Sequence, residues 1–493
     1  MAIKRYYLTK DNTITNAFKA DLLTRGTDAN MGASDILEAF VIHGQTSASI
    51  NATNAEQSRI LVEVAVDEIL QDIENEVIPS SSVSYVLKMY NAPHADSLPM
   101  DYSLDVAILT SSWAEGTGLD MENYSDRGAS NWISGTVGTP WTANGSDYNR
   151  TTAYSSSFYF SGGVEDLELN IDFAMDKWRT GTTPNYGLVI KHPDNIIAGG
   201  LGSYFTKKFF SRTSDFNLFR PYVEARWDSR REDDRGKITK TSVLRSNADN
   251  MNTLFLYNTV DGNLKDIPNL EGPQQEIFVQ FYSSSNSEPT GSPLNVKDTT
   301  GATVTTILGG LGVEKSSYLT GAYSCSFGFS EDNIDIVHDV WHSGSVQYYT
   351  GSFSVDSLEA KPLLYNEEYV NTIENLQNSY IKGQKPVLRM FSRLKDWSPN
   401  IYTVATQEIE PEIINSAYYR IRRTVDNFEV IPFGTGSTNH TLLSYDVSGN
   451  YFELDTSVLE KGYSYNIDFV FKKRGTFEQQ PETFKFRIEE DDE

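Results

Sequence analysis

The sequence predicts an all-β protein, built as tandem β-sandwiches with few short helices, and three observations support this. First, apolar and polar residues alternate in several runs, of which Tyr463–Phe471 is the clearest, and a period of two is typical of half-buried strands. Second, Gly, Asn, Asp and Pro separate these runs, as they do in sandwiches. Third, the chain contains 28 Tyr and 25 Phe, which favour strands over helices.

Five segments carry the strand pattern, and they are spread along the whole chain. In each of them apolar residues occupy alternate positions, so each strand is expected to bury one face against a core. The segments are Val83–Met89, Tyr102–Ile108, Tyr323–Phe329, Tyr463–Phe471 and Phe484–Ile488. Their recurrence, with turns in between, favours sandwiches over a doubly wound parallel sheet.

Helical spacing of apolar residues is found in two segments. Glu367–Ser379 places Tyr369, Ile373 and Leu376 at helical intervals, and Gly and Pro follow it. Val64–Ile73 is the second candidate, although its first residues also fit a strand. Both segments are interpreted as short connecting helices.

Two boundaries divide the chain into three predicted domains. The run Arg230–Gly236 carries charges of both signs and no apolar residue, so it is expected to be a solvent-exposed linker. The second boundary is expected between residues 360 and 383. The predicted domains are residues 1–235, 236–365 and 366–493, and the last two have about the size of an immunoglobulin-like sandwich, roughly 100 residues.

The composition excludes several classes of protein. The chain of 493 residues has 67 acidic and 41 basic side chains, a net charge of -26, so a general nucleic-acid-binding face is excluded. The acidic segment Glu489–Glu493 is expected to be solvated. One cysteine, Cys325, excludes an intrachain disulfide and a zinc site of several thiolates. Because Cys325 alternates with aromatic residues, it is expected to be an inert core thiol.

Signals for membrane insertion or export are not found in the sequence. No window approaches 18 apolar residues, the length that a membrane-spanning helix needs. The first residues are basic but lack the apolar stretch of a signal peptide. We therefore expect a soluble protein made in the cytoplasm, with no membrane partner.

Neither of the two candidate metal sites has a complete motif. His338 and His342 are four residues apart and could share a metal on a helix, but their neighbours indicate strand or loop. Asp120, Glu122 and Asp126, with Asn123, form an oxygen-rich segment that could hold calcium, yet its spacing is not that of an EF-hand, so a solvated turn is favoured.

Motifs for catalysis are also missing from the sequence. Neither a phosphate-binding loop nor a nucleophile elbow occurs, and no pair of carboxylates stands out for glycoside hydrolysis. We therefore expect no catalytic residue, no cofactor and no resident metal.

The stretch Tyr204–Arg245 is unusually basic for so acidic a chain. A docking surface for an acidic neighbour is one hypothesis for its cations. The residues assigned to that surface are Lys207, Lys208, Arg212 and Arg220. The alternative is that bases of this stretch pair with nearby acids such as Asp215, Glu224 and Asp228.

Seven motifs occur in a fixed order in the first 230 residues. They are Asp21–Glu38, Ser58–Val64, Ile78–Ser80, Trp113–Gly118, Ser130–Trp132, Asn185–Ile190 and Arg220–Glu224. In this order they resemble the DNRLRE-type β-sandwich, a module similar to carbohydrate-binding modules. The resemblance implies a jelly-roll sandwich over residues 1–235.

A second set of segments resembles a structural protein of marine T4-like myophages, over most of the chain. The segments are Lys4–Thr15, Glu115–Glu122, Tyr204–Arg212, Arg226–Asp228 and Asp339–His342. This resemblance implies a virion component without known catalysis, which is assembled in the host cytoplasm. Its implied partners are other virion proteins and copies of itself, arranged with rotational symmetry.

The expected function is that of a non-enzymatic virion structural protein, placed in the neck or tail first and on the capsid surface second. The rival hypothesis is a carbohydrate-binding protein for glycans on the host surface. Trp141, Tyr148 and Tyr154 are its candidate stacking residues, whose alternative role is to pack loops.

Overall fold

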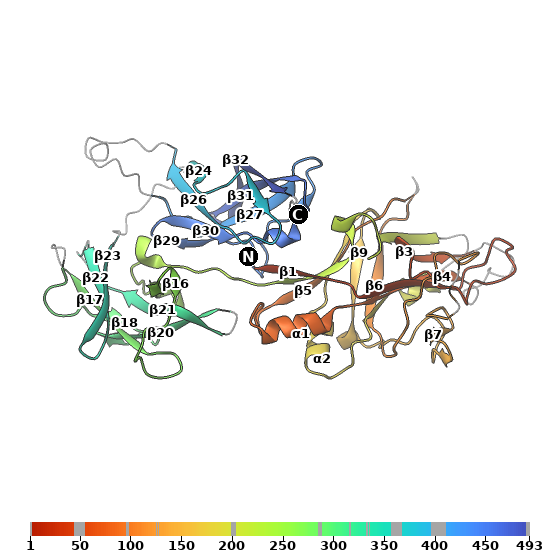
Figure 1. Ribbon diagram of the computed structural model, residues 1–493, viewed down its shortest axis with the longest axis horizontal. Helices are drawn as coiled ribbons and strands as arrows, with labels where there is room; N and C mark the ends of the chain where they lie inside the picture. Colours follow the sequence, from red (N-terminus) through yellow and green to blue (C-terminus); the bar gives the residue numbers. More distant parts are fainter. Residues whose placement is uncertain are drawn as a thin grey trace. The chain divides into compact units, whose positions relative to one another are not determined.

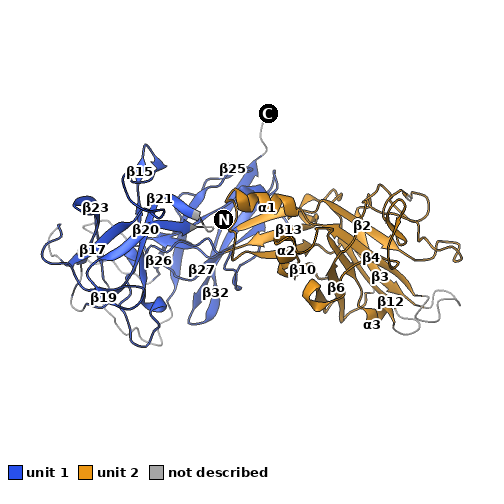
Figure 2. Ribbon diagram, turned by 90° about the horizontal axis from the view of Figure 1, so that it is seen from below, with its two compact units in different colours: residues 1–2, 228–493 blue, residues 3–227 orange. Residues whose placement is uncertain are grey.

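The fold is nearly all β, as the sequence predicts, and is organised as tandem β-sandwiches (Figure 1). The computed structural model describes residues 2–43, 55–94, 98–124, 126, 128–198, 204–283, 288–314, 317–331, 334, 336–355, 367–395 and 411–489. The chain forms two compact units, one of residues 3–227 and one of residues 228–493 together with the first two residues (Figure 2).

The unit of residues 3–227 contains a small antiparallel sheet of four strands. Its strand order is β1-β13-β5-β10. The strands are β1 (Ile3–Tyr7), β13 (Tyr222–Arg226), β5 (Ser84–Met89) and β10 (Leu167–Asn170). Leu87 and Met89 of β5 are fully buried, so this segment forms the strand that its alternating pattern predicts.

The same unit contains a larger antiparallel sheet, in the order β12-β3-β4-β11-β6-β9, with β2 paired to β4. The strands are β12 (Tyr204–Phe210), β3 (Ile36–Ile42), β4 (Glu56–Glu63), β11 (Leu188–Lys191), β6 (Tyr102–Ile108), β9 (Ser155–Phe160) and β2 (Lys10–Thr15). Leu104 and Val106 of β6 are fully buried, and Ser103 and Asp105 between them are half-buried. The predicted alternation of this strand is therefore confirmed.

Three α-helices lie in the described part of the chain. They are α1 (Val66–Glu74), α2 (Asp172–Arg179) and α3 (Asp194–Ile197). The predicted helix at 64–73 is thus confirmed, and its first turn holds Asp67 and Glu68, whose charges suit the positive end of the helix dipole. Among the described residues, no helix combines the length and apolar character needed to cross a membrane.

A long connection between β6 and β9, residues 109–154, covers the outer face of the larger sheet. Trp113, Trp132 and Trp141 of this connection pack with Leu61 of β4 and Val189 of β11 in a second, smaller core. Its regular elements are the short strands β7 (Ser134–Thr136) and β8 (Thr139–Pro140) and the turn η3 (Thr152–Tyr154). Large indole side chains thereby make a layer of irregular backbone rigid.

The second unit begins with an antiparallel sheet of eight strands. The order is β19-β18-β21-β20-β17-β22-β23, with β14 paired to β21. The strands are β14 (Asn252–Tyr257), β17 (Ile277–Ser283), β18 (Val296–Lys297), β19 (Thr303–Val304), β20 (Ile307–Glu314), β21 (Ser317–Phe329), β22 (Ile336–Ser343) and β23 (Val346–Ser354). A hairpin of β15 (Thr259–Val260) and β16 (Asn263–Leu264) is separate. Tyr323, Cys325 and Phe327 lie in the core, as predicted.

Two further sheets complete this unit. One has the order β24-β26-β30-β29 and the other β25-β32-β31-β27-β28, in which β25 and β32 are parallel. The first consists of β24 (Tyr369–Ile373), β26 (Val387–Leu394), β30 (Gly449–Glu453) and β29 (Ser444–Asp446). The second consists of β25 (Ser379–Ile381), β32 (Thr476–Glu489), β31 (Ser464–Lys473), β27 (Ala417–Arg423) and β28 (Glu429–Ile431). Ile467, Phe469 and Phe471 of β31 are fully buried, in agreement with the predicted period of two.

The predicted helix Glu367–Ser379 is wrong, because this segment contains β24 and the first residue of β25. Val370, Thr372 and Ile373 are β-branched, which favours a strand. Asn371 is buried and accepts a hydrogen bond from the hydroxyl of Ser392 on the neighbouring β26, at 2.7 Å. Tertiary pairing therefore overrides the helical spacing.

The expected exposed linker Arg230–Gly236 is also corrected. Asp233 is buried, and the side chain of Arg235 is 11% exposed. Arg235 binds the carboxylates of Asp233 at 3.0 Å and Asp339 at 2.8 Å, while the amide of Asp233 donates to the carbonyl of Tyr445. Opposite charges neutralise one another here, so the run is held inside without apolar residues. The boundaries at 235 and 365 stay predictions.

Candidate functional site

Lys207 does not lie on an exposed docking surface, which corrects the first of the four basic assignments. It is fully buried on β12, and its ammonium donates to Asn91 Oδ1 at 2.7 Å and to the carbonyls of Gly163 and Glu165 at 2.9 and 2.6 Å. Burial lowers the pKa of Lys207 to about 8. Neutral oxygens thus satisfy this charge within the sandwich.

The other three basic residues are engaged by their own unit. Both Nε and Nη2 of Arg212 bind the carboxylate of Glu115, at 2.6 and 2.5 Å. Lys208 lies 3.9 Å from Glu38, and Arg220 donates from Nε to the carbonyl of Ser214. Internal pairing is therefore the arrangement that the geometry favours over a docking surface.

The acidic partners agree only in part with those that the sequence indicated. Of the three expected acids, Glu224 binds a cation of the stretch, Arg226, at 2.6 Å. Glu115 binds Arg212 from 97 residues away. Asp228 accepts a hydrogen bond from the backbone of Arg230. Because Glu115 and Arg212 are far apart in sequence, no local sequence pattern could have predicted this ion pair.

Buried Asp11 of β2 completes a cluster with the partly exposed Glu115 and Arg212. The amide of Arg212 donates to Asp11 Oδ2 at 2.6 Å, and the amide of Asp11 donates to Glu115 Oε1 at 2.8 Å. Asp11 Oδ1 has no hydrogen-bond partner among the described residues. Burial raises the pKa of Asp11 to about 7.

The motifs that carry the DNRLRE resemblance meet beside this cluster. Asn30 Nδ2 donates to the carbonyls of Glu115 at 2.5 Å and Ser130 at 2.8 Å, and its Oδ1 accepts from the amide of Gly118. A Cβ atom on Gly118 would lie 1.9 Å from the carbonyl oxygen of Asn30. These motifs therefore fix the 109–154 connection to the sheet, which is a structural role.

Of the three candidate stacking residues, Trp141 is buried, so its assignment to an exposed glycan platform is wrong. Its exposed fraction is 6%, and its indole Nε1 donates to the carbonyl of Asn131 at 2.8 Å. Tyr148 and Tyr154 are half-buried. The ammonium of Lys177 lies 5.3 Å from the ring centre of Tyr154. The sequence-based alternative, packing of loops, describes Trp141 correctly.

Cations surround the ring of Tyr148, a feature that sequence reasoning missed. Arg150, Lys191 and Arg59 lie 4.9, 5.5 and 5.6 Å from its centre. Arg59 is buried, its guanidinium is 4.9 Å from the ring of Trp132, and burial lowers its pKa. The sequence offered one indication of this site, which is that Arg59 is a charged residue within the apolar run of β4.

Three buried polar atoms near this ring have no partner among the described residues. They are Arg59 Nε, Tyr148 OH and Ser146 Oγ. Buried polar groups are normally paired, so water or a polar ligand could accept a hydrogen bond from Arg59 Nε and form hydrogen bonds with the two hydroxyls.

The two candidate metal sites do not gather ligands. His338 and His342 lie on β22, and no group of three His, Cys, Asp or Glu side chains able to hold a metal occurs in the described ranges. Asp120 Oδ1 accepts from the backbone amides of Glu122, Asn123 and Tyr124, so this segment is an exposed turn. Burial raises the pKa of Cys325.

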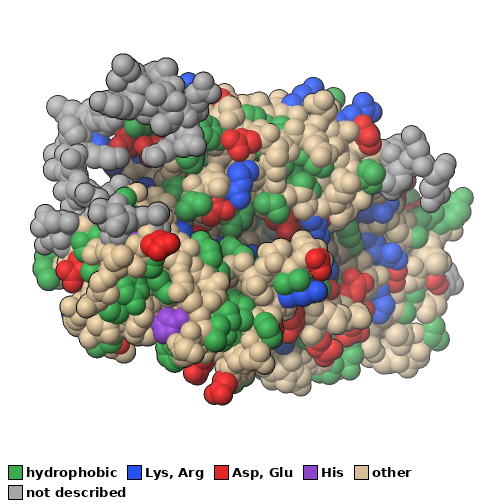
Figure 3. All heavy atoms as spheres, turned by 60° about the vertical axis from the view of Figure 1, so that its left-hand side comes forward, with side chains coloured by type: hydrophobic (Ala, Val, Ile, Leu, Met, Phe, Trp, Pro, Cys, Tyr) green, Lys and Arg blue, Asp and Glu red, His purple; other side chains and the backbone are tan. Residues whose placement is uncertain are grey.

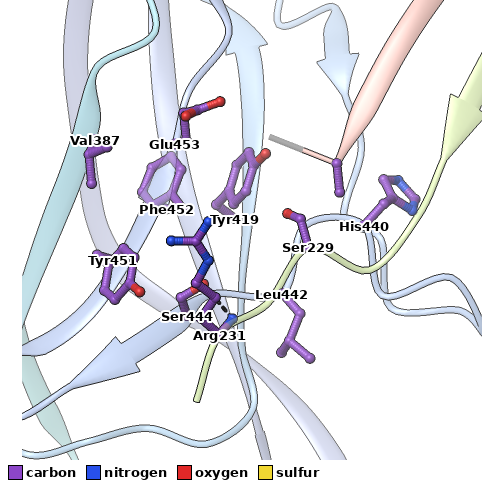
Figure 4. Close-up of a pocket in the computed structure, with 11 residues that line it drawn as sticks. Ser229, Arg231, Val387, Tyr419, His440, Leu442, Ser444, Tyr451, Phe452 and Glu453 are labelled. Atoms are coloured by element: carbon purple, nitrogen blue, oxygen red, sulfur yellow. Dashed lines mark hydrogen bonds between the residues drawn. The ribbon is translucent and has the colours of Figure 1, made fainter. Parts of the chain in front are cut away.

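A cavity of about 160 Å³ lies between the 229–231 segment and the two sheets that contain β27 and β30 (Figure 4). The side chain of Arg231 extends between Tyr419 and Tyr451 toward Phe452. The amide of Arg231 donates to Ser444 Oγ at 3.0 Å. The cavity is thus partly filled by a cation of the chain itself.

Apolar side chains are exposed on adjacent strands of the eight-stranded sheet. Leu308 of β20 is 56% exposed and lies opposite Phe278 of β17, which is 36% exposed and lies opposite His342 of β22. We call Leu308 and Phe278 the apolar row. Figure 3 shows small groups of hydrophobic side chains among polar and charged ones on the face turned toward the reader.

Comparisons with known proteins leave the family open. Neither a family model nor a curated protein matches the chain. Among solved structures, tandem Ig repeats of Dlar align with 43% of this chain and 81% of theirs, at 8% identity and a TM-score of 0.13. Native alpha-2-macroglobulin of E. coli aligns with 87% of this chain and 21% of its own, at 9% identity and a TM-score of 0.15.

Salmonella alpha-2-macroglobulin reacted with methylamine gives a comparable result. It aligns with 92% of this chain and 21% of its own, at 8% identity and a TM-score of 0.14. The chain therefore spans about a fifth of the length of the two macroglobulins. TM-scores this low carry no argument about function.

Proposed function

We propose that the chain is a non-enzymatic structural protein of a tailed-phage particle, associated with the neck or tail, that makes protein–protein contacts in a symmetric assembly. Its working parts are surfaces on rigid sheets. The resemblance of Lys4–Thr15, Glu115–Glu122 and Tyr204–Arg212 to structural proteins of marine T4-like myophages supports this place.

The apolar row is the observation that carries the proposal. Exposed apolar side chains on neighbouring strands mark surfaces that another protein covers. Strands hold Leu308 and Phe278 in fixed positions, so covering them costs little conformational entropy. A partner that contributes apolar side chains of its own would bury both.

Immunogold electron microscopy of purified phage particles tests the proposal. Antibodies raised against the purified chain are expected to label the neck or tail. Label spread over the capsid would support the alternative of a capsid-surface protein. Particles that contain the phage's other structural proteins but bind no antibody would reject a virion role.

A carbohydrate-binding function is the second candidate, and the unpartnered polar atoms near Tyr148 favour it. Sugar hydroxyls could satisfy Tyr148 OH and Ser146 Oγ. A glycan array probed with the purified protein and with a Tyr148→Ala variant separates the two functions. Binding that the variant loses would support glycan recognition, and equal signals from both proteins would exclude Tyr148 as a contact.

A further inference from the structure

A buried lysine lies against a side-chain amide in the unit of residues 3–227. Lys207 is fully buried on β12, and its Nζ lies 2.7 Å from Oδ1 of Asn91, 116 residues earlier in the chain. Because a C=O bond is about 1.2 Å long, Nζ lies within about 4 Å of the carbonyl carbon, Cγ. A primary amine and a carboxamide held this close are the two reactants of an amide exchange.

Backbone hydrogen bonds hold the two reactants in place. The amide of Ala92 donates to the carbonyl of Lys208 at 3.0 Å, and the amide of Phe210 donates to the carbonyl of Tyr90 at 3.1 Å. The asparagine follows β5 of the four-stranded sheet, and the lysine lies on β12 of the larger sheet. Fixed positions of this kind remove most of the entropy cost of bringing two reacting groups together.

The surroundings of Nζ favour the reactive form of the lysine. The ring centres of Phe160 and Phe209, both fully buried, lie 4.7 and 5.4 Å from it. Burial lowers the pKa of Lys207 to about 8, although the charges of Glu165 and Asp166 oppose this shift. About one tenth of the lysine is therefore a neutral amine at pH 7, and a neutral amine is nucleophilic.

Hydrogen bonds orient this neutral amine toward Asn91. The ammonium donates to Asn91 Oδ1 and also to the carbonyls of Gly163 and Glu165, at 2.9 and 2.6 Å. Loss of the proton that faces Asn91 leaves the other two hydrogen bonds in place. The lone pair of Nζ then points at the Asn91 side chain.

His94 polarises the carbonyl group that the amine would attack. Its Nε2 lies 2.9 Å from Asn91 Oδ1, so the tautomer with the proton on Nε2 donates to this oxygen. Burial, together with the charges of Lys207 and Lys208, lowers the pKa of His94 to about 4, so the ring is neutral at pH 7. A donor held at this oxygen stabilises the negative charge that develops there during attack.

We propose that Lys207 and Asn91 form an intramolecular isopeptide bond. The lone pair of Nζ forms the new bond to Cγ, the bond between Cγ and Nδ2 breaks, and a proton passes from Nζ to Nδ2, which leaves as ammonia. One amide is exchanged for another, so the step needs no oxidant and no co-reactant. Asn91 is half-buried, so the ammonia can reach solvent. The bond would join the segment after β5 to β12 covalently, and the proposal does not depend on the virion role.

Mass spectrometry of the full chain tests the proposal. The intact protein is expected to be lighter than its sequence by the mass of one ammonia, about 17 Da. Incubation at pH 9, which is above the pKa of about 8 for Lys207, should raise the converted fraction. Digestion with trypsin should then give a branched peptide that joins Lys207 to Asn91, with no cleavage after Lys207.

Four variants identify the reacting groups. Lys207→Arg replaces the amine by a guanidinium that stays protonated, so this variant should keep its full mass. Lys208→Arg is the matched control, because it changes the neighbouring lysine, whose side chain is 35% exposed, and it should lose ammonia as the wild type does. Asn91→Ala removes the carboxamide and should keep its full mass. His94→Ala retains both reactants and should slow the conversion at least about tenfold.

Wild-type protein that keeps its full mass at pH 9 and is cleaved normally after Lys207 would overturn the proposal. This measurement needs no variant, so it decides the question even if a substitution prevents folding. Loss of ammonia that persists in Asn91→Ala, without a branched peptide in the wild type, would also overturn it. Such a loss would come from another asparagine, such as Asn144, which precedes Gly145 and can close to a succinimide.

Discussion

Buried charges in this chain are compensated in two different ways. Lys207 donates three hydrogen bonds to neutral oxygens, whereas Glu224 lies between the guanidinium groups of Arg5 and Arg226, at 2.8 and 2.6 Å. Although burial alone would raise it, the two cations lower the pKa of Glu224 to about 2. Removal of one partner in either arrangement would leave an uncompensated buried group.

Replacing Lys207 by Glu should destabilise the unit of residues 3–227 by about 3–5 kcal/mol, because a buried carboxylate would face the same three oxygen acceptors. Lys208→Glu is the control, since the side chain of Lys208 is 35% exposed and should cost about 1 kcal/mol or less. Urea unfolding followed by circular dichroism measures both. Equal stability of the two variants would contradict the buried role of Lys207.

Asp11 should make stability depend on pH. Its pKa is about 7 in the folded chain against an ordinary value of 3.8, so the folded state binds its proton more tightly. The stabilisation is complete below pH 4 and is lost as the pH rises through about 7, by up to about 4 kcal/mol at about 1.4 kcal/mol per pKa unit.

Asp11→Asn should remove this dependence, and urea unfolding of both proteins between pH 4 and pH 8 measures it. The difference between wild type and variant isolates Asp11 from other titrating groups. Parallel stability curves over that range would show that Asp11 is not protonated near neutral pH in the folded chain.

At the scale of elements, the alternation of apolar and polar residues predicted β5, β6, β21 and β31. One face of each strand packs on a core, so apolar residues recur at every second position of the sequence. The helix α1 was also predictable from its apolar spacing. The exposed linker and the helix at 367–379 were predicted wrongly. Their burial and pairing depend on partners far away in sequence, such as Asp339, Tyr445 and Ser392.

The candidate sites were less predictable than the strands. The types Lys and Trp indicated surface contacts for Lys207 and Trp141, yet strand register turns Lys207 inward and packing of the 109–154 connection buries Trp141.

The run Arg230–Gly236 should behave as a structural element, not as a linker. Arg235→Met would leave Asp339, which is fully buried, without its cation at 2.8 Å, and should cost about 3–5 kcal/mol. Arg230→Met would break a partly exposed pair with Glu232 and should cost at most about 1 kcal/mol. Thermal unfolding ranks the two, and a harmless Arg235→Met would contradict the buried ion pair.

At the scale of the whole molecule, the proposed function depends on one kind of surface. On that proposal, the apolar row supplies hydrophobic contact with a different protein. A net charge of -26 makes copies repel one another. Salt screens this repulsion between copies, whereas it should change the hydrophobic contact of the apolar row little.

Loss of the apolar row should block entry into the particle without unfolding the chain. Leu308 is 56% exposed, so Leu308→Asp should change the free energy of unfolding by about 1 kcal/mol or less, whereas Phe278, at 36% exposed, is more than half buried and Phe278→Asp should cost about 1–2 kcal/mol. Leu244→Asp is the control, because Leu244 is 93% exposed and lies outside the sheets.

Complementation of a phage lacking the protein, followed by immunoblotting of purified particles, measures entry of each variant into the particle. The row variants should be depleted at least about tenfold relative to the control, since each carboxylate would be desolvated against an apolar partner. If both row variants fold and still enter the particle normally, the apolar row is not the contact surface. That result would remove the main support for the proposed function.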